Sequence, residues 1–263
     1  MRPLSAAKLL DVWERGAGSS PATLALLLLA AASDDAPPDQ LVSLPVGQRD
    51  ARLLELREQT FGREMSCLAT CPACHENLEC NLSVSDLLVA EQDAALNAVL
   101  PLPRGGGEGR GEGAAPSFSL QTADYCTTFR LPTSEDLISL PPQASLSESR
   151  HRLFQACLLS ASRRGEEIAA NELPSEVMTA VVGRMAELDP EADLQLRLDC
   201  PECGHRWNTS FDIISFLWTE IHAAATRLLR EVHEIASAYH WPEADILALT
   251  PQRRQAYLEL IRG

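Results

Sequence analysis

The chain contains 263 residues, of which 45% are hydrophobic and 5% aromatic, and its formal net charge is −15. The hydrophobic content excludes a chain that is disordered throughout, and the richness in Leu and Ala favours helices over a β-sandwich. A charge of this sign and size repels phosphate backbones, and we find no local basic patch, so the composition argues against binding nucleic acid.

The first residues carry no recognisable export signal, because acidic residues and Trp13 come before an apolar region could form. The most apolar stretch, residues 21–32, is well short of the roughly 20 residues that span a bilayer. It predicts a buried helix with Ser20 as N-cap and Pro21 in the first helical position. We therefore expect a cytoplasmic protein without membrane insertion. Its eight cysteines argue for metal binding and against a disulfide framework.

The N-terminal third is predicted to be helical, with helices near residues 4–15, 21–32 and 47–60. Residues 33–40, which contain paired Asp and paired Pro, predict a loop. After the sequence Cys-Pro-Ala-Cys at 71–74, apolar residues alternate from Leu78 to Val84, which is typical of a strand.

The middle of the chain begins with residues 101–116, a Gly-rich stretch that predicts a flexible loop. A hairpin is expected from two short strands, 118–122 and 125–131. Two amphipathic helices should follow. In the first, apolar residues repeat at helical spacing from Leu153 to Ala161 before Gly165 ends the run, and the second covers 174–188.

The last third predicts a short strand at 194–198, the sequence Cys-Pro-Glu-Cys at 200–203, and renewed alternation from Trp207. A long helix with one apolar face should begin at Ile214 and reach roughly 40 Å. Two shorter helices close the chain, with Thr250 as the N-cap of the last one; their ranges are 242–249 and 251–261.

We therefore expect an α+β fold that is predominantly helical and contains a small β zinc ribbon. Its predicted parts are an N-terminal helical region (1–63), a ribbon in two halves (64–90 and 193–213), the Gly-rich loop (101–116), an inserted hairpin with helices (117–192) and a C-terminal helical region (214–263).

The two Cys-Pro-x-Cys segments form the main candidate site. Each turn offers two thiolates and leads into an alternating strand, with Leu78 equivalent to Trp207. Zinc takes four ligands in a tetrahedron, so Cys71, Cys74, Cys200 and Cys203 together would complete its coordination and leave no position open. We predict one structural zinc ion bound by these four residues.

The separation of the two segments is unusual, because 125 residues lie between Cys74 and Cys200. The entropy of closing a loop grows only with the logarithm of its length, so the extra cost is about 2 kcal/mol. Structural zinc sites contribute roughly 10–16 kcal/mol in peptides, which is far more. The intervening residues are therefore interpreted as an insertion within a ribbon.

Other interpretations of the cysteines stay open. Cys71 to His75 matches the C-x-x-C-H pattern of haem attachment, either segment could act as a redox dithiol, and the thiols could also be metal-free. His75 and His205 could replace a cysteine ligand. The other four cysteines are most simply small apolar residues on strand or helix faces: Cys67, Cys80, Cys126 and Cys157. Of these, Cys67 and Cys80 also lie near enough to serve as spare ligands.

No catalytic pattern is recognisable. The Gly-rich run lacks the features of a phosphate-binding loop. His222 and His233 are eleven residues apart on one helix, which is about 16 Å, so they would form a solvated face rather than a metal pair. We expect a protein without catalytic residues and without a small-molecule substrate.

The C-terminal sequence EVHEIASAYHWPEADILALTPQRRQAYLELI, which includes Tyr239, Trp241 and Arg253, resembles the T4-like baseplate hub assembly chaperone family. The segment 49–62 and both Cys-Pro-x-Cys turns are similar to its larger members, which are found with bacterial contractile injection systems. His240 stands where we would expect a Gly, which should weaken the end of the long helix.

The resemblance implies partners in the baseplate wedge or hub and no catalytic residues. It predicts a non-enzymatic assembly factor or structural component of a phage-tail-like particle. The alternative is a zinc-ribbon module that binds nucleic acid or proteins and has no connection with baseplates.

Overall fold

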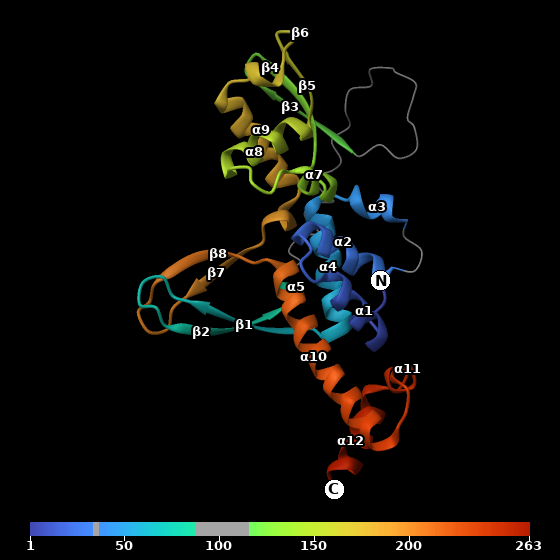
Figure 1. The fold of residues 1–263 in the computed structure, drawn as a ribbon. Helices are drawn as coiled ribbons and strands as arrows, with labels where there is room; N and C mark the ends of the chain where they lie inside the picture. Colours follow the sequence, from blue (N-terminus) through green and yellow to red (C-terminus); the bar gives the residue numbers. More distant parts are fainter. Residues whose placement is uncertain (34–36, 88–115) are drawn as a thin grey trace. The chain divides into compact units, whose positions relative to one another are not determined.

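The computed structural model describes residues 1–33, 37–87 and 116–263, and these residues divide into two compact units. Unit 1 comprises 1–37, 52–63 and 212–263, and unit 2 comprises 38–51 and 64–211. The chain is coloured along its sequence in Figure 1. The Gly-rich loop predicted at 101–116 falls almost entirely outside the described residues.

Unit 1 is helical. Its elements are α1 (Ala6–Gly16), α2 (Pro21–Ala32), most of α4 (Val46–Phe61), α10 (Ile213–Tyr239), α11 (Glu243–Leu247) and α12 (Pro251–Arg262). Both α1 and α2 contact α10, and the apolar sides of these helices form the buried interior. The predicted caps are confirmed, because the hydroxyl oxygens of Ser20 and Thr250 accept hydrogen bonds from the N–H groups of Thr23 and Arg253.

The C-terminal helices pack on the last turns of α10 through buried Val232, Ile235, Ile246 and Leu258. Beside this cluster, Tyr239, Trp241 and Tyr257 contact one another, with ring centroids 4.9–5.5 Å apart. The buried guanidinium group of Arg254 donates hydrogen bonds to Glu231 and to the carbonyl oxygen of Leu249. A buried charge that is paired in this way avoids the desolvation cost of a lone ion.

His240 ends α10 in the left-handed conformation, with φ 57°, and its N–H donates a hydrogen bond to the carbonyl oxygen of Ala236. The helix therefore has the left-handed C-terminal cap that usually takes Gly, although a residue with a Cβ occupies it.

The described residues of unit 2 form three antiparallel sheets. Two are hairpins, β1 (Glu64–Thr70) with β2 (Asn77–Ser83) and β7 (Gln195–Asp199) with β8 (Arg206–Ser210). The third has the order β3-β4-β5-β6, and its strands are Ser117–Thr122, Tyr125–Arg130, Leu158–Arg163 and Glu166–Glu167. In its described part, unit 2 also has the helices α3 (Pro38–Val42), α5 (Val84–Leu87), α7 (Ser134–Ser139), α8 (Leu146–Cys157) and α9 (Ser175–Leu188), with 3₁₀ turns η1 (Ala170–Glu172) and η2 (Pro190–Asp193).

The four-stranded sheet has its own apolar core, formed around Phe129 with contributions from α8 and α9. Its buried members are Phe129, Phe154, Ala161, Leu173, Val177 and Val181. The mixed α+β class and the small sheets predicted from the sequence are confirmed.

Several predicted boundaries were wrong. The helix expected to continue to Ala161 ends at Cys157, and the residues after it form β5, because pairing with β4 and burial of Ala161 against Phe129 outweigh the local helical periodicity. The loop expected at 33–40 gives way to α3 at Pro38. Strand β1 was not predicted.

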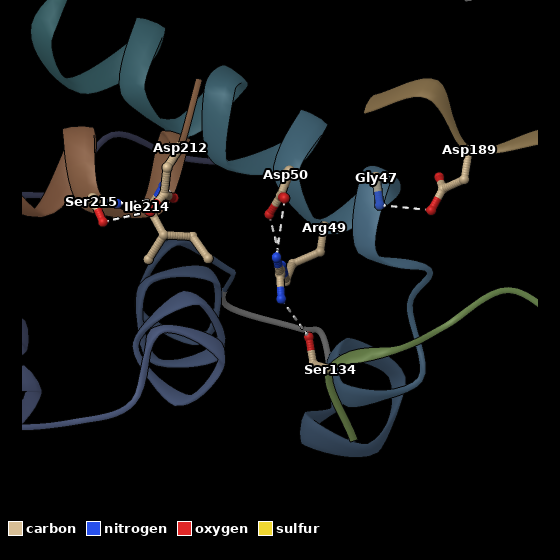
Figure 2. A network of polar contacts seen from close by, with 8 residues as sticks. All are labelled: Gly47, Arg49, Asp50, Ser134, Asp189, Asp212, Ile214 and Ser215. Carbon is tan, nitrogen blue, oxygen red and sulfur yellow. Dashed lines mark hydrogen bonds and ion pairs between the residues drawn. The ribbon is translucent and has the colours of Figure 1, made fainter. Parts of the chain in front are cut away.

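A buried polar network connects the N-terminal end of α4 to distant parts of unit 2, as Figure 2 shows. The N–H of Gly47 donates a hydrogen bond of 2.9 Å to the carboxylate of Asp189. Arg49 makes a two-pronged ion pair with Asp50, at 2.7 and 3.0 Å, and its guanidinium group also reaches the hydroxyl of Ser134. Burial raises the pKa of Asp189 to about 6, which the hydrogen bond from Gly47 partly opposes.

Candidate metal centre

The two Cys-Pro-x-Cys turns have the same backbone hydrogen bonds. In the first, the N–H of Cys71 donates to the carbonyl oxygen of Glu76, and the N–H of His75 donates to that of Cys71. In the second, the N–H of Cys200 donates to the carbonyl oxygen of His205, and the N–H of Gly204 donates to that of Cys200. All four distances are 2.9 Å, so each turn closes its hairpin in the same way.

Both turns require a left-handed residue directly after the second cysteine. Gly204 has φ 69°, and His75 occupies the equivalent place with φ 63°. This conformation lets the chain bend back into β2 or β8 while both thiols of a turn point to one side. Gly adopts it without steric cost, whereas the Cβ of His75 must be accommodated.

The two hairpins bring the four sulfurs together. In Figure 1, the turn between β1 and β2 lies beside the turn between β7 and β8. Every pair of sulfurs lies within 4.8 Å. The Sγ atoms of Cys71 and Cys203 are 3.7 Å apart, and those of Cys74 and Cys200 are 3.6 Å apart. Each of these two contacts joins the first cysteine of one turn to the second cysteine of the other. Cys71 and Cys200 are buried, while Cys74 and Cys203 are exposed.

These distances fit a tetrahedral metal ion. A zinc–sulfur bond of about 2.3 Å places the sulfurs of a tetrahedron about 3.8 Å apart, close to the separations observed. A disulfide would require about 2.05 Å, and all eight cysteines are free thiols. The donor set consists of sulfur alone, which suits zinc or another soft cation rather than magnesium or calcium.

The proximity of the thiols makes them compete for ionisation. Desolvation by burial raises the pKa of Cys71. Hydrogen bonds from the N–H groups of Cys74 and Ala73 outweigh this effect and lower the pKa to about 6. For Cys74, the N–H of Glu76 lowers the pKa, yet desolvation and the neighbouring thiols raise it to about 12. The pKa of Cys203 is also raised. One thiolate therefore suppresses the next, and a bound cation would remove this repulsion.

The structure gathers the four cysteines predicted as ligands and leaves out the other candidates. Among the described residues, no second group of three or more potential ligands lies together, and neither His75 nor His205 joins the first. The ring of His205 instead stacks on Trp207, with centroids 6.0 Å apart. Cys67 and Cys80 lie further along their strands and face each other.

The histidines of α10 form no metal pair in the described part of the chain. The Nδ1 atom of His222 accepts a hydrogen bond of 2.9 Å from the indole N–H of Trp13, and the two rings are 5.9 Å apart. This contact between α1 and α10 joins residues 209 positions apart, so it could not be predicted from the spacing of residues in the sequence.

None of the described helices is both long enough and apolar enough to cross a membrane. The structure is thus an α+β protein in which two distant hairpins form a candidate metal centre made of four thiols.

The chain is also similar to a known protein family. The family model described as T4 bacteriophage base plate protein matches residues 26–218, which is most of the chain, and the chain belongs to this family. The match encloses both cysteine turns and ends within α10 at Trp218, so α11 and α12 lie beyond it. No curated protein and no solved structure matches the chain.

Proposed function

We propose that the chain is a non-enzymatic component or assembly factor of the baseplate of a phage-tail-like contractile injection system, and that a zinc ion bound by Cys71, Cys74, Cys200 and Cys203 stabilises it. The observation that carries this proposal is the family match over residues 26–218, which includes all four cysteines.

The structural role of the zinc ion follows from its ligands. Four thiolates complete a tetrahedral shell, so no coordination position remains for water or substrate, which is the arrangement of structural rather than catalytic sites. When bound, zinc would supply a link between residues 126 and 132 positions apart in the sequence. The hairpins then present the thiols, and their backbone N–H groups favour the ionised form that the metal needs.

The charge of the chain favours proteins over nucleic acid as partners. Several large apolar side chains are exposed, among them Leu68, Leu146 and Leu260, which are 70–75% accessible. The net charge of −15 disfavours DNA or RNA as the partner. We infer that wedge or hub proteins of the baseplate cover part of this surface, as the predicted relation to hub assembly chaperones implies.

Co-expression tests this proposal directly. The chain is produced with the baseplate, sheath and tube proteins of a contractile injection system, purified by an affinity tag, and its partners are identified by mass spectrometry. We expect specific recovery of wedge or hub proteins. Recovery of none of the particle proteins would contradict the assignment to a baseplate.

The role of the metal needs a separate comparison. Elemental analysis of protein purified without chelator should find about one zinc ion per chain, as four thiolate ligands predict. Cys200→Ser should lose the metal and the bound partners together, whereas Cys126→Ser, which changes an exposed cysteine outside the centre, should keep both. Wild-type protein that binds its partners without any metal would refute the structural role of zinc but not the baseplate assignment.

The two forms of the proposal, component and assembly factor, make different predictions for finished particles. A component should be present in purified particles at a constant ratio to the other baseplate proteins. An assembly factor should bind baseplate intermediates and be absent from the particle.

A further inference from the structure

Two cysteines outside the candidate metal centre lie directly opposite each other in the first hairpin. The antiparallel register of β1 and β2 pairs Cys67 with Cys80. Residues paired in this way have Cα atoms roughly 4.5–5.5 Å apart and side chains on the same face of the sheet. A disulfide needs Cα atoms about 4.4–6.8 Å apart, so the backbone already satisfies this requirement.

The thiol of Cys67 also contacts Cys80. The Sγ atom of Cys67 lies 3.6 Å from the carbonyl oxygen of Cys80, to which it donates. Burial raises the pKa of Cys67, and the thiol of Cys80 raises it further by its charge and by a hydrogen bond. Both residues are half-buried and both thiols are free, so a reagent in solution has partial access to them.

This pair is separate from the four-cysteine centre. Cys67 and Cys71 are four positions apart in the sequence, which corresponds to about 13 Å of extended chain, and neither Cys67 nor Cys80 belongs to the cluster of four sulfurs. The other two cysteines offer no comparable partner. Cys126 pairs with Gln121 and Ser162, and Cys157 is buried at the end of α8.

We propose that Cys67 and Cys80 form an oxidisable dithiol, a modification site that closes a cross-strand disulfide when the protein meets a small-molecule disulfide. One of the two sulfurs, as a thiolate, attacks the reagent, forms a mixed disulfide and releases one reagent thiolate. The second sulfur loses its proton and attacks the protein sulfur of the mixed disulfide, which releases the other reagent thiolate. Two protein thiols are oxidised, one reagent disulfide is reduced, and the two protons pass to the released thiolates, which become thiols.

The disulfide would join β1 to β2 independently of the metal, because it lies on the strands and not in the turn. In an oxidising environment, the hairpin that carries Cys71 and Cys74 would then keep its register even while the metal is absent. Reduction by an added dithiol would reverse the modification.

The test uses the full-length, metal-loaded protein and glutathione disulfide as the reagent. After reaction, remaining thiols are alkylated in denaturant with chelator, and the protein is digested without reduction by a protease that cleaves after Glu. Cleavage at Glu76 and Glu79 separates the two cysteines into different peptides. We expect a disulfide-linked pair of peptides, with Cys71 and Cys74 alkylated and the metal content unchanged.

Three variants sharpen the test. Cys67→Ser and Cys80→Ser should each abolish the linked peptides and leave the remaining cysteine free or joined to glutathione. Cys126→Ser, which alters an exposed cysteine on another sheet, should leave the linkage intact. The proposal is wrong if wild-type Cys67 and Cys80 remain alkylatable, carry glutathione separately, or link to a cysteine of the metal centre. If a variant fails to fold, the disulfide-linked peptides of the wild-type protein alone decide whether Cys67 and Cys80 are joined.

Discussion

The two cysteine hairpins of unit 2 reach the same geometry from different sequences. Their turns share the same hydrogen bonds and a left-handed conformation directly after the second cysteine. The strands that follow, β2 and β8, share the alternation of exposed and half-buried residues. The first hairpin places His75 at this position and the second places Gly204. The geometry is therefore set by the requirement to direct two thiols to one point, and a residue with a Cβ is tolerated where that requirement is met.

The largest expected effect comes from removing one ligand from each hairpin in turn. If the hairpins contribute equally, Cys71→Ser and Cys200→Ser should both reduce zinc from about one ion per chain to nearly none, because three thiolates leave the tetrahedron incomplete. Elemental analysis and thermal unfolding measure this. Retention of zinc by one variant but not by the other would break the equivalence of the hairpins.

Removal of the metal from intact protein should have a similar but reversible effect. A strong chelator is expected to expose the amides of both hairpins to hydrogen exchange, since the thiols of their turns would no longer be held together by an ion. Amides in the sheet β3–β6 serve as the internal control, because that sheet has its own core. Protection that persists in both hairpins without metal would contradict a structural role for the ion.

The thiols of the candidate metal centre differ in pKa, so they differ in whether zinc binding must remove a proton from them. Because the pKa of Cys71 is lowered to about 6 while those of Cys74 and Cys203 are raised, zinc binding at pH 7.5 should release at least two protons per ion. Apparent affinity should consequently fall as the pH is lowered. Calorimetric titrations in buffers of different ionisation enthalpy count these protons, and a release below one would show that the thiols are already ionised.

A smaller effect is expected from adding a side chain to the second turn. Gly204→Ala places a Cβ at φ 69°, which should cost about 1 kcal/mol in the free energy of unfolding. Nothing lies within 4 Å of the added carbon, so the loss would report backbone conformation rather than a clash. Denaturant unfolding of the zinc-loaded protein measures it.

The smallest change is the reverse substitution in the first turn. His75→Gly should stabilise the protein by about 0.5–1 kcal/mol, because Gly adopts the left-handed conformation without steric cost. His240→Gly provides a matched control at the end of α10, where φ is 57° and no cysteine is near in the sequence. A gain at position 240 with a loss at position 75 would indicate that the His75 side chain itself supports the turn.

Much of the helical structure could be predicted because its signals are local. The helix at Pro21–Ala32 has a Ser N-cap, a Pro in the first position and an apolar run, and its predicted bounds agree with those observed. The two cysteine turns could be recognised because their spacing reflects the chemistry of one ion.

The remaining features depend on contacts between distant residues. Strand β1 alternates weakly, since its inward side chains include Cys67 and Ala69 while the larger Leu68 is 75% exposed. Without β1, the pairing of Cys67 with Cys80 could not be foreseen. Strand β5 has a helical pattern in its sequence, and only its pairing with β4 shows that it is extended.

The close approach of α4 to the turn η2 has a consequence for the evolution of the chain. A Cβ on Gly47 would lie 2.3 Å from the Oδ1 atom of Asp189 and 2.8 Å from the backbone nitrogen of Ala192. Shortening the aspartate would relieve the first conflict but not the second, which involves the main chain. Any other amino acid at the equivalent position of a related protein would therefore reveal that the segment following α9 takes a different path there.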